Sequence, residues 1–244
     1  MKVLITGATG FIGLELLRRL PEVVSEIHVL SREAARADET FARVLSPHRR
    51  EKIRSFSWDA ERSVAPATAC DGVDAVIHLA GENIGAGRWS KETKRRIMSS
   101  RELGTRNLVQ GLNRLSRPPV FISISATGIY GNAGDTVLTE ESPRGVGFLA
   151  DVCATWEKEA MAANVSRRVI PRLGVVLAPG GGALAKLLPV FRAGIGGRVG
   201  DGRQWMSWVH RDDVVGFLIQ AMTDPKIDGV YNLVAPEPVR NETF

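Results

Sequence analysis

The segment Gly7-Ala8-Thr9-Gly10-Phe11-Ile12-Gly13 constrains the fold of this 244-residue chain more than any other. It directly follows a short β-branched run at residues 3–5. It also opens a stretch in which apolar residues recur at helical spacing up to Leu20, where Pro21 is expected to end the helix. A strand, a glycine turn and a helix in this order form a unit that binds dinucleotides. We expect the following residues of the turn to contact such a cofactor: Gly7, Thr9, Gly10, Phe11 and Ile12.

Each glycine of this turn has its own physical role. Gly7 permits the tight turn, Gly10 lets the backbone approach a pyrophosphate, and Gly13 lets the helix pack closely on the sheet. The N–H groups of Phe11 and Ile12, together with the helix dipole, then meet the phosphates.

Strand-like and helix-like stretches alternate from the N-terminus to residue 177. This alternation predicts an α/β fold, a Rossmann-like doubly wound parallel sheet, whose core domain spans residues 1–177. The segment 47–50 is expected to be a solvated loop. The expected strands are 3–5, 27–30, 53–56, 75–79, 120–125 and 169–177, and the expected helices are 12–20, 33–45, 90–114 and 149–163.

The pattern changes after residue 177, where glycines crowd the sequence and only residues 183–191 look helical. This composition predicts a small C-terminal substrate lobe over residues 178–244, with chain segments that return to the sheet. Residues 240–244 resemble the start of a helix capped by Asn241. We therefore expect the natural protein to continue beyond residue 244.

Composition excludes several classes of protein. Hydrophobic residues make up 44% of the chain and charged residues 24%, which is typical of a globular protein. No apolar run approaches the roughly 18 residues that span a membrane, and no signal-peptide pattern opens the chain. Cys70 and Cys153 provide neither a disulfide framework nor a metal cluster, so we expect a cytoplasmic location and no metal. Lys and Arg are scattered despite a net charge of +5, so we expect no nucleic-acid or membrane partner; the oligomeric state is left open.

The end of the second expected strand indicates which dinucleotide is bound. A site for NAD places Asp or Glu there to hold the ribose 2′-hydroxyl, but this strand ends Leu30-Ser31-Arg32. The planar guanidinium of Arg32 can donate two parallel hydrogen bonds to a 2′-phosphate. Ser31 and Arg32 therefore predict NADP. The neighbouring Glu33 complicates this interpretation, and Arg32 could instead be an ordinary surface arginine.

Several motifs together resemble a known family. The glycine turn, His78-Leu79-Ala80-Gly81, Gly104-Thr105 and Tyr130-Gly131 resemble the extended short-chain dehydrogenase/reductases, the superfamily of nucleotide-sugar epimerases. More narrowly, the chain resembles an atypical, epimerase-like branch of poorly known function. That closer resemblance rests on residues 79–84 with 88–89, 125–131, 156–157, 172–177 and 208–213.

The resemblance implies further cofactor contacts. Residues Leu79, Ala80 and Gly81 would lie against the adenosine ribose and pyrophosphate. Arg101 would reach the cofactor, although it could also be a solvated helix charge. Val176 would touch the nicotinamide side.

The resemblance also raises a question about catalysis. Ordinary members use Ser or Thr with Tyr-x-x-x-Lys, whose tyrosine moves a proton while hydride passes to or from the nicotinamide. Ser125 fits the serine position, but Leu149 stands at the tyrosine position and Cys153 at the lysine position. The predicted catalytic residues are therefore Ser125 and Tyr130. Other candidates for proton transfer are Asp151, Cys153 and His210, whereas Asp212 and Asp213 are expected to cap a helix.

Two hypotheses follow. The first is an NADP(H)-dependent oxidoreductase or epimerase-like protein that acts on an unknown small molecule. Ser125 and the lobe tryptophans Trp205 and Trp208 favour it. The second is a non-catalytic NADP(H)-binding or sensing protein on the same fold, which the missing tyrosine and lysine favour.

Overall fold

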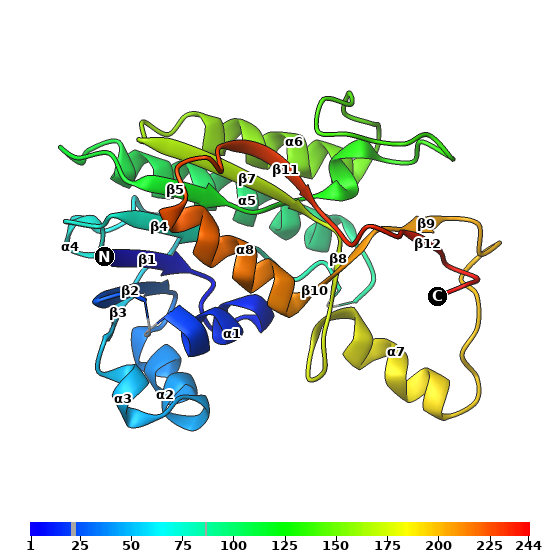
Figure 1. Cartoon of the computed structure of the whole chain (residues 1–244), viewed down its shortest axis with the longest axis horizontal. Coiled ribbons are helices and arrows are strands. Elements are labelled where there is room, and N and C mark those ends of the chain that lie inside the picture. Colours follow the sequence, from blue (N-terminus) through cyan, green and yellow to red (C-terminus); the bar gives the residue numbers. More distant parts are fainter. Residues whose placement is uncertain (21–22, 86) are drawn as a thin grey trace.

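The central element of the fold is one parallel β-sheet (Figure 1). The computed structural model describes residues 1–20, 23–85 and 87–244. Within these residues, eight strands form the sheet in the order β11-β7-β5-β4-β1-β2-β3, and β6 pairs with β7. The strands are β1 (Lys2–Thr6), β2 (Glu26–Ser31), β3 (Ile53–Ser57), β4 (Ala75–His78), β5 (Val120–Ser123), β6 (Ser125–Ala126), β7 (Arg167–Leu173) and β11 (Gly229–Leu233).

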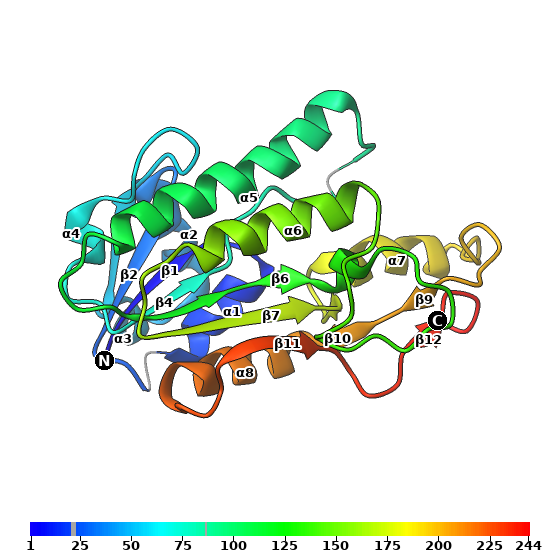
Figure 2. The same ribbon diagram turned by 90° about the horizontal axis from the view of Figure 1, so that it is seen from above.

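Helices cover both faces of this sheet, as Figures 1 and 2 show. Successive strand residues point to opposite faces, so Val3 and Ile5 pack with one set of helices and Leu4 with the other. The first set is α1 (Phe11–Arg19), α2 (Ala34–Val44) and α8 (Arg211–Thr223), and the second is α4 (Ala67–Cys70), α5 (Lys91–Leu112) and α6 (Phe148–Met161). The predicted doubly wound α/β fold is confirmed. Among the described residues, no helix combines the length and apolarity needed to cross a membrane.

The strand order reverses between β1 and β4, which are neighbours in the sheet. In open α/β sheets, ligands bind at such a reversal, beyond the carboxyl ends of the strands. The glycine turn follows β1 and the Leu79-Ala80-Gly81 segment follows β4, so both lie at this position.

Several predicted boundaries need correction. The predicted loop 47–50 is a short helix, α3 (Pro47–Arg50), with proline in its first turn. The predicted strand 120–125 is interrupted between β5 and β6. The predicted strand 169–177 is also divided, because β8 (Val175–Leu177) leaves the sheet to pair with β10 (Trp208–His210). Gly174 allows this departure, since a Cβ there would lie 2.8 Å from the Ser207 carbonyl oxygen. Pro21, expected to end α1, lies outside the described residues.

The proposed lobe is built around α7 (Gly182–Arg192) and a pair of short antiparallel strands, β9 (Trp205–Met206) and β12 (Val239–Arg240). Between these strands the chain returns to the central sheet as α8 and β11. The expected helix at Asn241 is wrong: residues 241–243 form a turn, and the Asn241 side chain accepts from the Val199 N–H at 2.7 Å. The domain division at residue 178 stays a prediction.

A buried polar chain ties the sheet to α5. The His78 ring lies 2.7 Å from the Thr6 hydroxyl through Nδ1 and 3.0 Å from the Thr105 hydroxyl through Nε2. Burial, with a contribution from the positive charge of Arg101, lowers the pKa of His78 to about 3. The imidazole is therefore neutral in the folded protein at neutral pH.

Protonation of His78 is expected to couple stability to pH. In the unfolded chain, His78 binds a proton below about pH 6.5. In the folded protein, it binds that proton only near pH 3, so acidification between these values favours unfolding. We expect the unfolding free energy to fall towards pH 5 by up to about 1.4 kcal/mol per pH unit from this residue. Chemical denaturation at several pH values should show a shallower slope for His78→Gln. The exposed His48→Gln is the control, and an unchanged slope in His78→Gln would contradict the assignment.

Candidate cofactor-binding and catalytic site

The turn between β1 and α1 is packed backbone against backbone. Gly7 has φ +71, and a Cβ there would lie 2.8 Å from the Ala80 nitrogen. A Cβ on Gly13 would lie 2.4 Å from the Gly7 carbonyl oxygen. Real Cβ atoms do not approach so closely, so only glycine fits at these two positions. Gly10 differs, because its Cβ would meet only the Gly7 oxygen, at 3.1 Å, and would otherwise face open space.

The N-terminus of α1 has no side-chain cap. Gly10 is its N-cap and offers no side chain, and no acidic residue lies in the first turn. Among the described residues, no acceptor is hydrogen-bonded to the N–H groups of Phe11 and Ile12. Free N–H groups and the positive end of the helix dipole form a ready site for phosphate. The predicted turn residues therefore lie together, with Thr9 and Gly10 exposed at the open side.

An arginine side chain with no partner among the described residues follows the end of β2. Arg32 is exposed and forms no hydrogen bond or ion pair with any residue that the structure describes. The Ser31 hydroxyl donates to the Glu33 carbonyl at a long 3.4 Å. The Glu33 carboxylate lies 3.9 Å from the guanidinium of Arg36, one helical turn away. Ser31 ends β2, the strand next to β1, and Arg32 follows it, at the same end of the sheet as the glycine turn.

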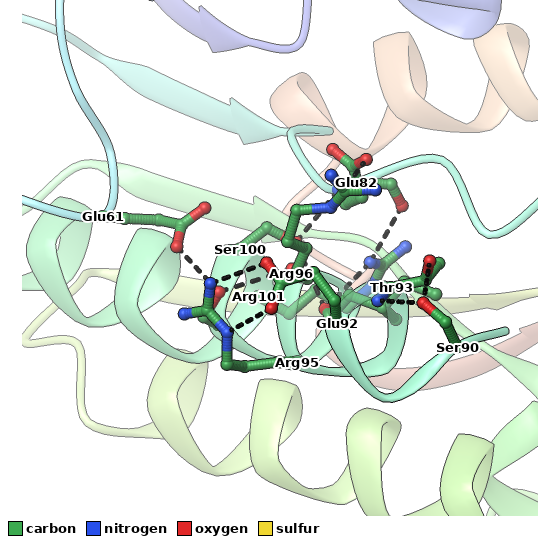
Figure 3. Close-up of polar contacts among 11 residues, drawn as sticks. Glu61, Glu82, Ser90, Glu92, Thr93, Arg95, Arg96, Ser100 and Arg101 are labelled. Carbon is green, nitrogen blue, oxygen red and sulfur yellow. Dashed lines mark hydrogen bonds and ion pairs between the residues drawn. The ribbon is translucent and has the colours of Figure 1, made fainter. Parts of the chain in front are cut away.

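The segment after β4 is held from both sides. The Thr6 hydroxyl accepts from the Ala80 N–H at 3.1 Å, which joins the segment to β1. Figure 3 shows the contacts with α5. The Glu82 N–H donates to the Ser100 hydroxyl at 3.0 Å, and Arg101 Nη1 donates to the Glu82 carbonyl at 3.1 Å. The end of β4 is therefore fixed beside the glycine turn.

Arg101 brings a partly buried positive charge to this segment. A Cβ on Gly81 would lie 3.1 Å from the Arg101 Cζ, and the guanidinium lies 4.8 Å over the ring of Trp156. Arg101 forms no ion pair with a carboxylate in the described ranges, and burial lowers its pKa from the ordinary value. Arginine nonetheless stays charged in proteins. Arg101 is therefore not a fully solvated helix charge, and its contact with a cofactor stays a prediction.

Ser125 lies against a buried ion pair. Its hydroxyl donates to Glu157 Oε1 at 2.6 Å. The same carboxylate accepts from Arg172 Nε and Nη2, both at 2.9 Å, in a two-point contact between β7 and α6. Burial of this pair is tolerated because each charge has several partners.

Tyr130, the last residue of the 3₁₀ helix η2 (Thr127–Tyr130), contacts the same arginine. Its hydroxyl accepts from Arg172 Nη1 at 2.8 Å and donates to Asn232 Oδ1 at 2.6 Å. The two predicted catalytic hydroxyls are thus brought to one ion pair. In this arrangement, both of their protons are donated to acceptors within the protein.

Leu149 and Cys153, which stand at the tyrosine and lysine positions, both lie close to Gly128 of η2. A Cβ on Gly128 would lie 3.5 Å from the Leu149 Cβ and 3.8 Å from the Cys153 sulfur. Burial raises the pKa of the Cys153 thiol to about 11, so it is neutral at physiological pH. The thiol cannot provide the positive charge of a lysine.

The remaining proton-transfer candidates have structural partners. Asp151 is exposed and forms an ion pair with Arg144 at 2.9 Å. His210 is the N-cap of α8, and its Nδ1 accepts from the Asp212 N–H at 3.2 Å. The expectation that Asp212 and Asp213 cap this helix is therefore wrong. Both lie in its first turn, where their negative charges interact favourably with the helix dipole.

Comparison with known proteins identifies the family. A family model described as the NAD dependent epimerase/dehydratase family matches residues 3–233. The chain belongs to this family. Within it, the chain falls in the epimerase-like branch of the extended short-chain dehydrogenase/reductases, as its motifs suggest.

Relatives of this epimerase family occur in distant organisms. The chloroplastic SDR39U1 homolog of Arabidopsis thaliana, an epimerase family protein, is 40% identical over 98% of this chain and 67% of its own length. The crystal structure of human epimerase family protein SDR39U1 with NADPH has a TM-score of 0.80 and 31% identity, over 99% of this chain and 77% of that one. A nucleoside-diphosphate sugar epimerase from Corynebacterium glutamicum has a TM-score of 0.79 and 34% identity, over all of this chain and 48% of its own.

Sequence reasoning about this family member missed the partners of the two hydroxyls. Glu157 and Arg172 appeared only as parts of motifs, and Asn232 was not singled out. The position of Arg172 nevertheless indicates that it has a partner, because it lies within the buried apolar strand β7 and a buried charge is normally paired. The partner itself is 15 positions away in sequence, so local spacing does not reveal it.

The contrast between Gly10 and Gly13 gives a test of the phosphate site. We expect Gly10→Val to leave the melting temperature close to that of the wild type but to abolish stabilisation by NADPH, because the side chain occupies the phosphate position. Gly13→Ala should lower the melting temperature of the ligand-free protein, because its Cβ meets backbone. Thermal unfolding with and without NADPH measures both. A Gly10→Val protein that saturating NADPH still stabilises would exclude this position for the pyrophosphate.

Proposed function

We propose that this protein binds NADP(H) and acts as an oxidoreductase or epimerase-like protein on a small molecule. The observation that carries the proposal is that two features lie at the same end of the sheet. The N-terminus of α1 at Phe11 has no side-chain cap, and Arg32, which has no partner among the described residues, follows the neighbouring strand β2. The human relative whose structure contains NADPH supports it.

The preference for NADP over NAD rests on charge at the tip of β2. A 2′-phosphate can accept two hydrogen bonds from the free guanidinium of Arg32, whereas a 2′-hydroxyl lacks its usual carboxylate partner here. Glu33 is the nearest carboxylate in sequence, and it lies beside Arg36.

The proposed cofactor set extends along the carboxyl end of the sheet. Arg101 is suited to the phosphates or the ribose on the nicotinamide side, because it brings a cation to Gly81. Val176 lies in β8, where the chain leaves the sheet towards the proposed lobe. The full set is Gly7, Thr9, Gly10, Phe11, Ile12, Ser31, Arg32, Leu79, Ala80, Gly81, Arg101 and Val176. Because Cys70 and Cys153 are free thiols, we also propose a reducing compartment such as the cytoplasm.

Arg32 gives the decisive test of cofactor choice. We expect wild-type protein to bind NADPH more tightly than NADH, and Arg32→Ala to lose about ten- to a hundredfold of NADPH affinity while NADH affinity changes little. Calorimetric titration of both dinucleotides measures this. Arg36→Ala, which removes an exposed arginine from the same region, is the control. Equal wild-type affinities for NADPH and NADH would refute the preference.

The bound nicotinamide would supply or accept hydride, and the chain must then move or polarise a proton. Ser125 and Tyr130 are the hydroxyls we propose for this role. Either hydroxyl can polarise a substrate oxygen only if its proton turns away from its internal acceptor. If the Ser125 proton turns away, Glu157 still accepts two hydrogen bonds from Arg172. Such a step uses hydrogen bonding rather than the tyrosinate–lysine route.

One observation favours the second candidate function, a non-catalytic NADP(H)-binding or sensing protein. Ser125 and Tyr130 each donate their proton at 2.6 Å to an internal acceptor, and the Cys153 thiol is neutral. The cofactor half of the site needs none of these groups.

Activity measurements separate the two functions. We expect NADPH oxidation with some member of a panel of small carbonyl compounds and nucleotide sugars, and a loss of about 10²–10³ in rate for Ser125→Ala or Tyr130→Phe. Tyr231→Phe changes the chain's other tyrosine and is the matched control. If a substrate is found and both variants keep full activity, the catalytic assignment is wrong. If no substrate reacts while NADPH binds at micromolar affinity or better, the sensing function is supported.

A further inference from the structure

The side chain of Phe11 reaches from the glycine turn to the start of α7. A Cβ on Gly181 would lie 2.4 Å from Phe11 Cδ2, and one on Gly182 would lie 3.0 Å from Phe11 Cε1. Gly182 also has φ +62, which side-chain-bearing residues rarely adopt. The ring therefore fits against two consecutive residues because neither has a side chain.

A second contact holds the same ring from α8. The guanidinium of Arg211 lies 4.8 Å over the Phe11 ring, within cation–π distance. Arg211 is held in turn by Glu15 of α1, at 3.5 Å. The ring thus joins the helix that begins at the glycine turn to both α8 and the start of α7.

Helix α7 also packs against β8. Among the described residues of the chain, none in α7 is fully buried. Lys186 of α7 approaches the segment after β4: a Cβ on Gly85 would lie 3.1 Å from Lys186 Nζ and 3.3 Å from Asn83 Oδ1. The contacts of α7 with the glycine turn and with the segment after β4 thus lie in its N-terminal half.

We infer that Phe11 is a positioning residue that couples occupancy of the dinucleotide site to the placement of α7. The inference rests on the proposed function, because it requires a dinucleotide phosphate on the Phe11 N–H. One residue then serves both sites: its backbone donates to the phosphate and its ring fixes the start of α7. Such coupling is reciprocal, so a ligand that orders α7 also tightens dinucleotide binding.

Hydrogen exchange measured by mass spectrometry tests the coupling in the full chain. With wild-type protein, NADPH should slow exchange in the glycine turn and in residues 182–192 by at least about fivefold. In Phe11→Ala the backbone N–H remains, so a saturating concentration of NADPH should still protect the glycine turn, although the affinity falls with the lost coupling. Protection of residues 182–192 should be lost. Phe191→Ala is the control, because that ring lies on α7 but packs against Gly196.

Gly181→Ala tests the same contact from the other side, and its effect in the wild-type background does not depend on the folding of the Phe11 variant. In the wild-type background its Cβ displaces the ring, so both the melting temperature and the protection of α7 should fall. In the Phe11→Ala background the Cβ enters the vacated space, and the substitution should leave the melting temperature unchanged. This departure from additivity is the signature of direct contact.

The outcomes distinguish the inference from the proposed function. Full protection of residues 182–192 in Phe11→Ala, or additive effects of the two substitutions, would overturn the inference while NADPH binding stands. Protection confined to the glycine turn in wild-type protein would overturn it as well. Absence of NADPH protection at the glycine turn itself would overturn the proposed function and the inference with it.

Discussion

The contact between the backbone of Gly7 and the Leu79–Ala80 peptide is the constraint on which the rest of the structure depends. A Cβ at Gly7 would lie 2.8 Å from the Ala80 nitrogen, so any larger residue would force β1 and β4 apart at their carboxyl ends. Gly13 holds α1 against the same turn. These approaches place the free N-terminus of α1 beside the reversal of strand order. The proposed phosphate site is therefore a consequence of the close packing of the sheet and α1.

The largely buried ion pair of Glu157 and Arg172 explains why the two hydroxyls predicted to be catalytic are engaged inside the protein. Removing two charges from water is costly, and their attraction offsets that cost only when the remaining donors and acceptors are satisfied. Ser125 and Tyr130 provide such partners, at 2.6 and 2.8 Å. Any role towards a substrate must compete with this structural role.

Local patterns predicted much of the fold. The β1–α1 unit, the parallel sheet and the main helices all follow from apolar periodicity and glycine placement, which depend on near neighbours. Errors occurred where distant residues decide the outcome. Gly174 separates β7 from β8 because Ser207 and Trp208 pack against it. The Asn241 side chain accepts a hydrogen bond from the Val199 N–H instead of capping a helix. His210, instead of Asp212, caps α8 because its ring turns back onto the helix. Partners of Ser125 and Tyr130 were likewise invisible, since Glu157 and Asn232 meet them only through folding.

The two halves of the site differ in how freely they can change. The cofactor half consists largely of backbone groups whose positions depend on Gly7 and Gly13, and substitution there disturbs the sheet itself. The reactive half consists of side chains on α6 and after β5, where Leu149 and Cys153 pack against Gly128 without disturbing the backbone. Leu149 and Cys153 can therefore stand at the tyrosine and lysine positions without altering the backbone of the proposed dinucleotide site. The glycine turn therefore supports the proposed dinucleotide binding, whereas any proton transfer depends on side chains of α6 and of the segment after β5.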